Sequence, residues 1–157
     1  MMKNRMIVLL ALAVLVCCLA GCQAKPVLPA DNGGANTQTQ VSLADEMAAI
    51  RRSADELRSS LEKDALTQAD MNQKSEALRV LWDNALNRLL DEAKQTLTEA
   101  ELAKLTAEQT AWEADRSAAV EAAGQAYADG SMYAMVVNLE AARLTEERVN
   151  ELYDRLK

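Results

Sequence analysis

From Ser42 to the end of the chain, apolar residues recur every three to four positions and polar residues occupy the positions between them. That spacing is the period of an α-helix and differs from the alternation of a strand. Proline is absent from this region, and glycine occurs there only at Gly124 and Gly130, so little interrupts a helix. The pattern predicts an all-α domain over residues 42–157, an antiparallel bundle or hairpin of three to four long helices.

Capping residues mark the first two predicted helices. Ser42 and Thr67 are each followed three residues later by an aspartate, the spacing at which a hydroxyl and a carboxylate can cap a helix start. The first helix is expected over about residues 43–64 and the second over about 68–95, with Trp82 in the core of the second.

The third and fourth helices flank the clearest turn of the region. The third is expected from Thr98 to about residue 127, and the fourth from about residue 131 to residue 156. The break before the third helix rests on two threonines, so one continuous rod through the second and third helices is the alternative. Tyr127 and Tyr133, on either side of the turn, are expected to lie partly in the core.

The first residues follow a different pattern. Lys3 and Arg5 precede an uncharged apolar run over residues 6–19, which is shorter than the roughly 20 residues of a membrane span. This arrangement predicts a secretory signal peptide over residues 1–21. Leu-Ala-Gly before Cys22 resembles the lipobox of bacterial lipoproteins. The resemblance implies cleavage before Cys22 and attachment of fatty acyl chains such as palmitate to that residue, which would hold the protein on a membrane.

The segment after the cysteine is predicted to be a flexible tether over residues 22–41. It contains both prolines, two adjacent glycines and almost no large apolar residue, a composition that does not form a core. Gln23 stands where an aspartate commonly marks inner-membrane retention in lipoproteins of two-membrane bacteria. By that resemblance, the expected location is the outer membrane facing the periplasm if the host is Gram-negative. An uncleaved anchor and a signal without lipid are the alternatives.

Net charge bears on which partners are expected, and cysteine content bears on whether a disulfide is expected. Residues 22–157 hold all 24 acidic residues and 15 of the 17 basic ones, which leaves a net charge of −9. An acidic surface argues against nucleic acid and favours basic partners, although the charge can also serve solubility alone. Cys22 is the only cysteine after the predicted cleavage site, so no internal disulfide is expected.

The chain lacks the residues of most catalytic and metal sites. It has no histidine, no thiol in the helical region and no glycine-rich phosphate loop. The usual nucleophile–base pairs and transition-metal ligand sets are therefore missing. We expect no catalytic residue, no metal and no cofactor, and therefore a protein that is not an enzyme.

Three sets of residues resemble the lysozyme inhibitor LprI family of small secreted helical domains. They stand in the family's order and spacing over about residues 67–156: Asp83-Asn84-Ala85-Leu86-Asn87; then Gln109, Trp112 and Arg116; then Gly130-Ser131 with Thr145, Arg148 and Leu152. Family members usually carry disulfide-bonded cysteines beside these motifs. This chain departs from them, with Ser75, the stretch 117–120 and Ala141-Ala142 at such places. The helices of this chain are therefore expected to be held together by packing alone.

Most of these motif residues are predicted to be structural. Gln109, Trp112 and Arg116 fall on one helix face. A carboxylate at Asp83 facing Arg116 would make a charge-assisted bond between helices, strongest if bidentate. We predict the same structural role, holding helices together, for Asn87, Thr145 and Arg148.

Together with the predicted lipid anchor and the acidic charge, the family resemblance implies an envelope protein that binds a basic lysozyme-like hydrolase and blocks its cleft. Asp129, Gly130 and Ser131, the tightest polar turn, are the candidate contact residues, although this turn is also an ordinary helix connection. The alternative function is a structural or adaptor lipoprotein of the envelope without catalytic activity. The sequence leaves the target enzyme, the affinity and the oligomeric state open.

Overall fold

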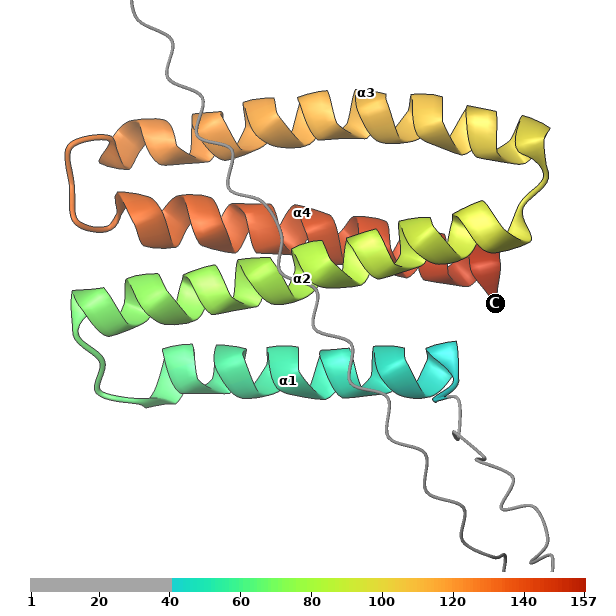
Figure 1. Cartoon of the computed structure of the whole chain (residues 1–157). Coiled ribbons are helices and arrows are strands. Elements are labelled where there is room, and N and C mark those ends of the chain that lie inside the picture. Colours follow the sequence, from blue (N-terminus) through green and yellow to red (C-terminus); the bar gives the residue numbers. More distant parts are fainter. Residues whose placement is uncertain (1–40) are drawn as a thin grey trace, which may run out of the picture. The chain divides into compact units, whose positions relative to one another are not determined.

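The structure, a computed structural model, describes residues 41–157 and contains four helices there (Figure 1). They are α1 (Leu43–Lys63), α2 (Gln68–Thr96), α3 (Glu99–Gly124) and α4 (Tyr133–Leu156), with a single 3₁₀ turn η1 (Gln125–Tyr127) after α3. No strand occurs in these residues. The predicted all-α fold is confirmed. The predicted signal peptide, Cys22 and residues 22–40 of the predicted tether lie outside the described residues.

The predicted helix starts are correct where a hydroxyl caps the helix. The side chains of Ser42, Thr67 and Thr98 each accept a hydrogen bond from the backbone N–H three residues later. Because Thr98 caps α3 and Leu97 ends α2 in extended backbone, the continuous-rod alternative is wrong. The differences lie around the turn, where α4 begins two residues later than predicted, at Tyr133, and has no side-chain cap.

The helices form two antiparallel hairpins, α1–α2 and α3–α4, that pack together mainly through α2 and α4 (Figure 1). Contacts between α2 and α4 advance in the same direction along both helices. Asn72 bonds to Ser131, just before α4, and Arg79 bonds to Asn138 on α4, so these two helices run parallel. α4 lies beside both α2 and α3, and α3 packs against the rest of the unit chiefly through α4.

The core is built from the facing stripes of α2 and α4. Trp82 is completely buried, as predicted, and belongs to one core cluster with the other large buried apolar side chains. α1 adds a narrower face, and α3 adds one large fully buried side chain. The buried apolar residues are Met47, Ala54, Leu78, Trp82, Ala85, Leu86, Leu89, Ala93, Leu105, Ala141, Ala142, Val149 and Leu152.

Small and polar residues complete the α2–α4 contact. Ser75 is fully buried and donates a hydrogen bond from its hydroxyl to the carbonyl of Asn72 at 2.8 Å. Ala141 and Ala142 are buried as well. Described residues 41–157 contain no cysteine, so packing and polar contacts alone hold these helices together.

Polar bonds attach α1 to both central helices. Arg51 donates to the side-chain oxygen of Asn150 on α4 at 2.8 Å, and Arg88 on α2 donates to Glu46 at 3.0 Å. Arg58 pairs with Glu146 of α4 as well. None of the four helices is long and apolar enough to cross a membrane.

Candidate functional site

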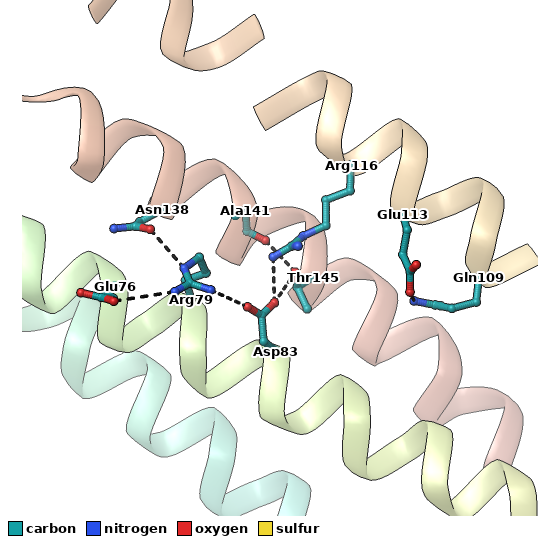
Figure 2. A network of polar contacts seen from close by, with 9 residues as sticks. All are labelled: Glu76, Arg79, Asp83, Gln109, Glu113, Arg116, Asn138, Ala141 and Thr145. Atoms are coloured by element: carbon teal, nitrogen blue, oxygen red, sulfur yellow. Dashed lines mark hydrogen bonds and ion pairs between the residues drawn. The ribbon is translucent and has the colours of Figure 1, made fainter. Parts of the chain in front are cut away.

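Asp83, near the middle of α2, is the centre of a polar network that joins three helices (Figure 2). Its carboxylate accepts hydrogen bonds from Arg79 at 2.8 Å and from Arg116 of α3 at 2.7 Å. The hydroxyl of Thr145 on α4 lies 3.5 Å from the same carboxylate and donates to the carbonyl of Ala141 at 2.7 Å. The predicted bond between Asp83 and Arg116 is therefore present, through one guanidinium nitrogen of Arg116.

The network extends through residues that the sequence did not single out. Arg79 uses its Nε to donate to the side-chain oxygen of Asn138 on α4 at 3.1 Å (Figure 2). Arg79 stands four residues before Asp83 on the same helix, a spacing that marks an ion pair in a sequence. Asn138 is 59 residues away from Arg79, and no local pattern points to it.

Gln109 and Arg148 form a second polar contact, between α3 and α4. Arg148 Nε donates to Gln109 Oε1 at 3.1 Å, and Arg148 Nη1 donates to Glu151 at 2.9 Å. Both side chains are buried, with 5% of Arg148 and 7% of Gln109 exposed. Gln109 in turn donates to Glu113 at 3.2 Å. This contact fixes the position of α3 against α4, because a buried guanidinium needs directed acceptors.

Two further residues of the family motifs, Trp112 and Asn87, lie nearer the surface. Trp112 is half-buried against the core, and the guanidinium of Arg116 lies over its ring, 5.7 Å from the ring centre. Asn87 is exposed on α2 and lines a groove of about 380 Å³ between α2 and α3. Gln109 and three leucines line the same groove.

The predicted contact residues occupy the segment that joins α3 to α4. We call residues 125–133 the α3–α4 tip. Asp129, Gly130 and Ser131 are all exposed there. Two backbone hydrogen bonds fold the segment, from the N–H of Gly130 to Tyr127 at 2.8 Å and from the N–H of Tyr133 to Gly130 at 3.1 Å.

Two contacts hold the tip against the helices. Asn72 of α2 donates from its side chain to the carbonyl of Ser131 at 3.2 Å. Gly124, the last residue of α3, packs closely on α4, since a Cβ placed there would lie 2.7 Å from both Tyr133 and Val137. The tip therefore has a defined shape set by its neighbours.

The expectation that the two tyrosines lie partly in the core is wrong. Tyr127 is 39% exposed and Tyr133 is 40% exposed. One edge of Tyr133 packs on Gly124, while Tyr127 belongs to the 3₁₀ turn and not to α3. The helical stripe breaks at Gly124, so positions beyond it no longer face the core.

The titratable groups with shifted pKa values are placed in ion pairs and helix caps. Hydrogen bonds from Thr67 lower the pKa of Asp70, and hydrogen bonds from Thr98 lower the pKa of Glu101. A hydrogen bond from Arg155 lowers the pKa of Glu108. Each of these shifts favours the charged carboxylate, which is the opposite of what a general acid requires. The described residues include no group of three or more side chains arranged to hold a metal ion.

The fold and its polar network define a small all-α domain whose motif residues mostly join helices. Residues 59–152 match the family described as lysozyme inhibitor LprI. The match covers more than half of the chain and includes every motif residue and the tip, so this chain belongs to the LprI family. No curated protein and no solved structure matches it.

Proposed function

We propose that this protein binds lysozyme-like peptidoglycan hydrolases and inhibits them by occluding the substrate cleft. The observation that carries the proposal is the match to the lysozyme inhibitor family over residues 59–152. The proposed action is binding and not catalysis.

Charge supports the choice of partner. Residues 41–157 contain 23 of the 24 acidic and 14 of the 17 basic residues of the chain, a net charge of −9. Lysozymes are typically basic and cleave their substrate with two carboxylates in a cleft. Opposite net charges raise the rate at which two proteins meet, and this effect weakens as salt is added.

The shape of the tip supports occlusion. It stands at one end of the α3–α4 hairpin (Figure 1). Asp129, Gly130 and Ser131 are exposed there. A folded loop at the end of two helices can enter a concave site that a flat helix face cannot reach. We therefore assign the contact with the hydrolase to this end of the molecule.

We also propose that acyl chains on Cys22 hold the protein in the cell envelope, at the outer membrane of a Gram-negative host. The apolar run ending in Leu-Ala-Gly-Cys supports this placement. Expression with a labelled fatty acid, followed by mass spectrometry of the amino-terminal peptide, tests it. The label should be present in the unaltered chain and absent from Cys22→Ser; an unlabelled, uncleaved chain would contradict the proposal.

Inhibition is tested by titrating the full chain, in mild detergent, into lysozymes of several types while the clearing of a cell-wall suspension is followed. We expect inhibition that weakens as the salt concentration rises. An unrelated acidic helical protein of similar charge serves as the control and should not inhibit. Absence of inhibition at micromolar excess over every lysozyme would refute the proposal. A stable oligomer without affinity for any hydrolase would instead favour a structural or adaptor protein.

A further inference from the structure

Exposed large apolar side chains are concentrated at the α3–α4 tip. Five such side chains are exposed in residues 41–157, and Tyr127, Met132 and Tyr133 account for three of them, with 39%, 40% and 40% of their surface exposed. The other two are Val41, at the edge of the described residues, and Val80 on α2. Clustered exposed apolar residues mark interaction sites more often than single ones do.

The residue types at the tip are those that contribute most to protein interfaces. Tyrosine and methionine are enriched where partners meet, and tyrosine is frequent among the few residues that supply most of the binding energy. A tyrosine also brings a large contact area with few rotatable bonds, so less conformational freedom is lost on binding.

The structure fixes the backbone of the tip and the ring of Tyr133 before any partner arrives. Gly124 allows α3 to approach Tyr133 closely, and the backbone bonds between Tyr127, Gly130 and Tyr133 close the turn. The bond from Asn72 to the carbonyl of Ser131 attaches the tip to α2. A preformed loop binds more tightly than a flexible one because less of the contact energy is spent on ordering it.

The stretch of chain that forms this end of the hairpin carries acidic residues and no basic ones. Between Arg116 and Arg143 the chain has no lysine or arginine, and its charged residues are Glu121, Asp129 and Glu140. Asp129 lies within the tip itself. An apolar centre with an acidic residue beside it fits a concave apolar site bordered by lysine or arginine.

We propose that Tyr127, Met132 and Tyr133 are the apolar anchor by which the tip enters a concave site on a basic hydrolase, with Asp129 facing basic residues at its rim. Asp129, Gly130 and Ser131 then give the loop its shape and charge, and the flanking apolar side chains supply most of the binding energy. This inference rests on the proposed inhibition of lysozyme-like enzymes and names the surface that performs it.

The direct test uses the full chain with Tyr127 and Met132 both changed to alanine. Tyr133 is left in place because it packs on Gly124. The matched control is Val80→Ala, which removes an equally exposed apolar side chain from α2. We expect the double variant to bind the inhibited lysozyme about 10- to 100-fold more weakly. The control should bind as the unaltered chain does, and both variants should keep the circular dichroism of the unaltered chain.

Amide hydrogen exchange provides a test that needs no variant. On addition of the lysozyme, amides of residues 125–133 should exchange more slowly, whereas amides at the opposite end of the bundle, near Leu97, should not change. Protection confined to other surfaces would overturn the inference even if the double variant failed to fold.

Charge at the rim is tested by kinetics. Asp129→Lys should slow association and reduce its salt dependence while leaving dissociation nearly unchanged, because a rim charge acts mainly on the encounter rate. Asp115→Lys, at an exposed carboxylate in the middle of α3, is the matched control. Equal effects of the two changes would mean that only net charge matters and would contradict a role for Asp129 at the rim.

The outcomes separate this inference from the proposed function. If the unaltered chain inhibits and the double variant inhibits equally well, Tyr127 and Met132 are not the anchor and the inference is wrong, while the proposed inhibition of lysozyme-like hydrolases still stands. If the unaltered chain binds no hydrolase, both are overturned. If sedimentation shows a dimer that only the double variant disrupts, with no change in hydrolase binding, a second copy of this chain occupies the tip and the inference is wrong.

Discussion

The α2–α4 pair and α3 are held in the same unit by different forces. α2 contributes Leu78, Trp82 and Leu89 to the buried core, and α4, its main packing partner, contributes Val149 and Leu152. α3 has one fully buried large apolar side chain, Leu105. Its other attachments include the packing of Trp112 on the core, the bonds of Arg116, Gln109 and Glu108, and the close approach at Gly124.

This difference shows what each kind of contact determines. Apolar burial is strong and non-directional, so it stabilises the α2–α4 pair without specifying a single register. The bonds from Arg116 to Asp83 and from Arg148 to Gln109 require particular atoms to meet, and they therefore fix the position of α3 along the other helices. The groove between α2 and α3 remains open because these helices meet mainly through α4.

The largest effect is expected at the centre of the α2–α4 pair. Trp82→Ala should lower the free energy of unfolding by about 3–5 kcal/mol, measured by urea denaturation followed by circular dichroism. Trp82→Phe keeps a ring and removes the buried indole N–H, which has no hydrogen-bond partner in the described residues, so it should cost only about 1–2 kcal/mol. If Leu105→Ala on α3 cost as much as Trp82→Ala, the contrast between the two regions would be wrong.

Removal of the central carboxylate should loosen α3 specifically. Asp83→Ala leaves Arg79 and Arg116 without their shared acceptor and should cost about 1–3 kcal/mol. Hydrogen exchange should then speed up along α3 more than along α2. Asp91→Ala, which removes an exposed partner of Lys94 on the same helix, is the control and should cost less than about 1 kcal/mol. Uniform acceleration along both helices would mean that the network does not act on α3 in particular.

The close approach of α3 to α4 predicts a smaller loss. In Gly124→Ala the new Cβ would lie 2.7 Å from Val137 and Tyr133, and the displacement of these side chains should cost about 1–2 kcal/mol in thermal unfolding. Gly130→Ala is the matched control. Its nearest contact would be an ordinary 3.4 Å, so we expect a change of less than about 0.5 kcal/mol. Equal effects at the two glycines would exclude a special role for the α3–α4 contact.

The smallest effect on stability is expected at the helix caps, which have the same form at the start of α2 and at the start of α3. Bonds from Thr98 hold the pKa of Glu101 below its ordinary value of 4.5, and bonds from Thr67 hold that of Asp70 below 3.8. A lowered folded-state pKa adds stability above the unfolded value, and this stability is lost as the pH falls through the folded value.

Glu101→Gln should therefore make the melting temperature fall less steeply than in the unaltered chain as the pH is lowered from about 5 to about 3. Asp70→Asn should do the same for α2. A markedly larger effect at Glu101 would show that the cap contributes to the difference between the helices.

Local features of this fold are predictable because their causes lie within a few residues. The caps at Ser42, Thr67 and Thr98 each involve atoms three residues apart, and the structure contains all three. The pair of Asp83 and Arg116 was predictable in kind, since a carboxylate and a guanidinium on facing helices attract each other. Its connection to Asn138 was not, because nothing near Asn138 in the chain indicates which residue it meets.

The tip shows the limit of periodicity. Tyr127 continues the apolar spacing of α3, which predicts a partly buried side chain, but α3 ends at Gly124 and Tyr127 is exposed. The turn at Gly130 was visible in the sequence as a break. The exposure of the apolar residues on either side of this turn depends on how closely α3 approaches α4. That distance is set by the packing of the helices and not by the local sequence.

The sequence by itself determined the helical class, the starts of the three helices that have a hydroxyl cap and the core position of Trp82, because propensity, capping and periodicity act over one or two turns of chain. Only the tertiary structure decided that α2 and α4 run parallel, that α4 lies beside both α2 and α3, and that Asp83 joins three helices. A stripe of apolar residues indicates which face of a helix is buried, but it does not identify the helix that packs on that face. That choice depends on the shapes of all four helices together.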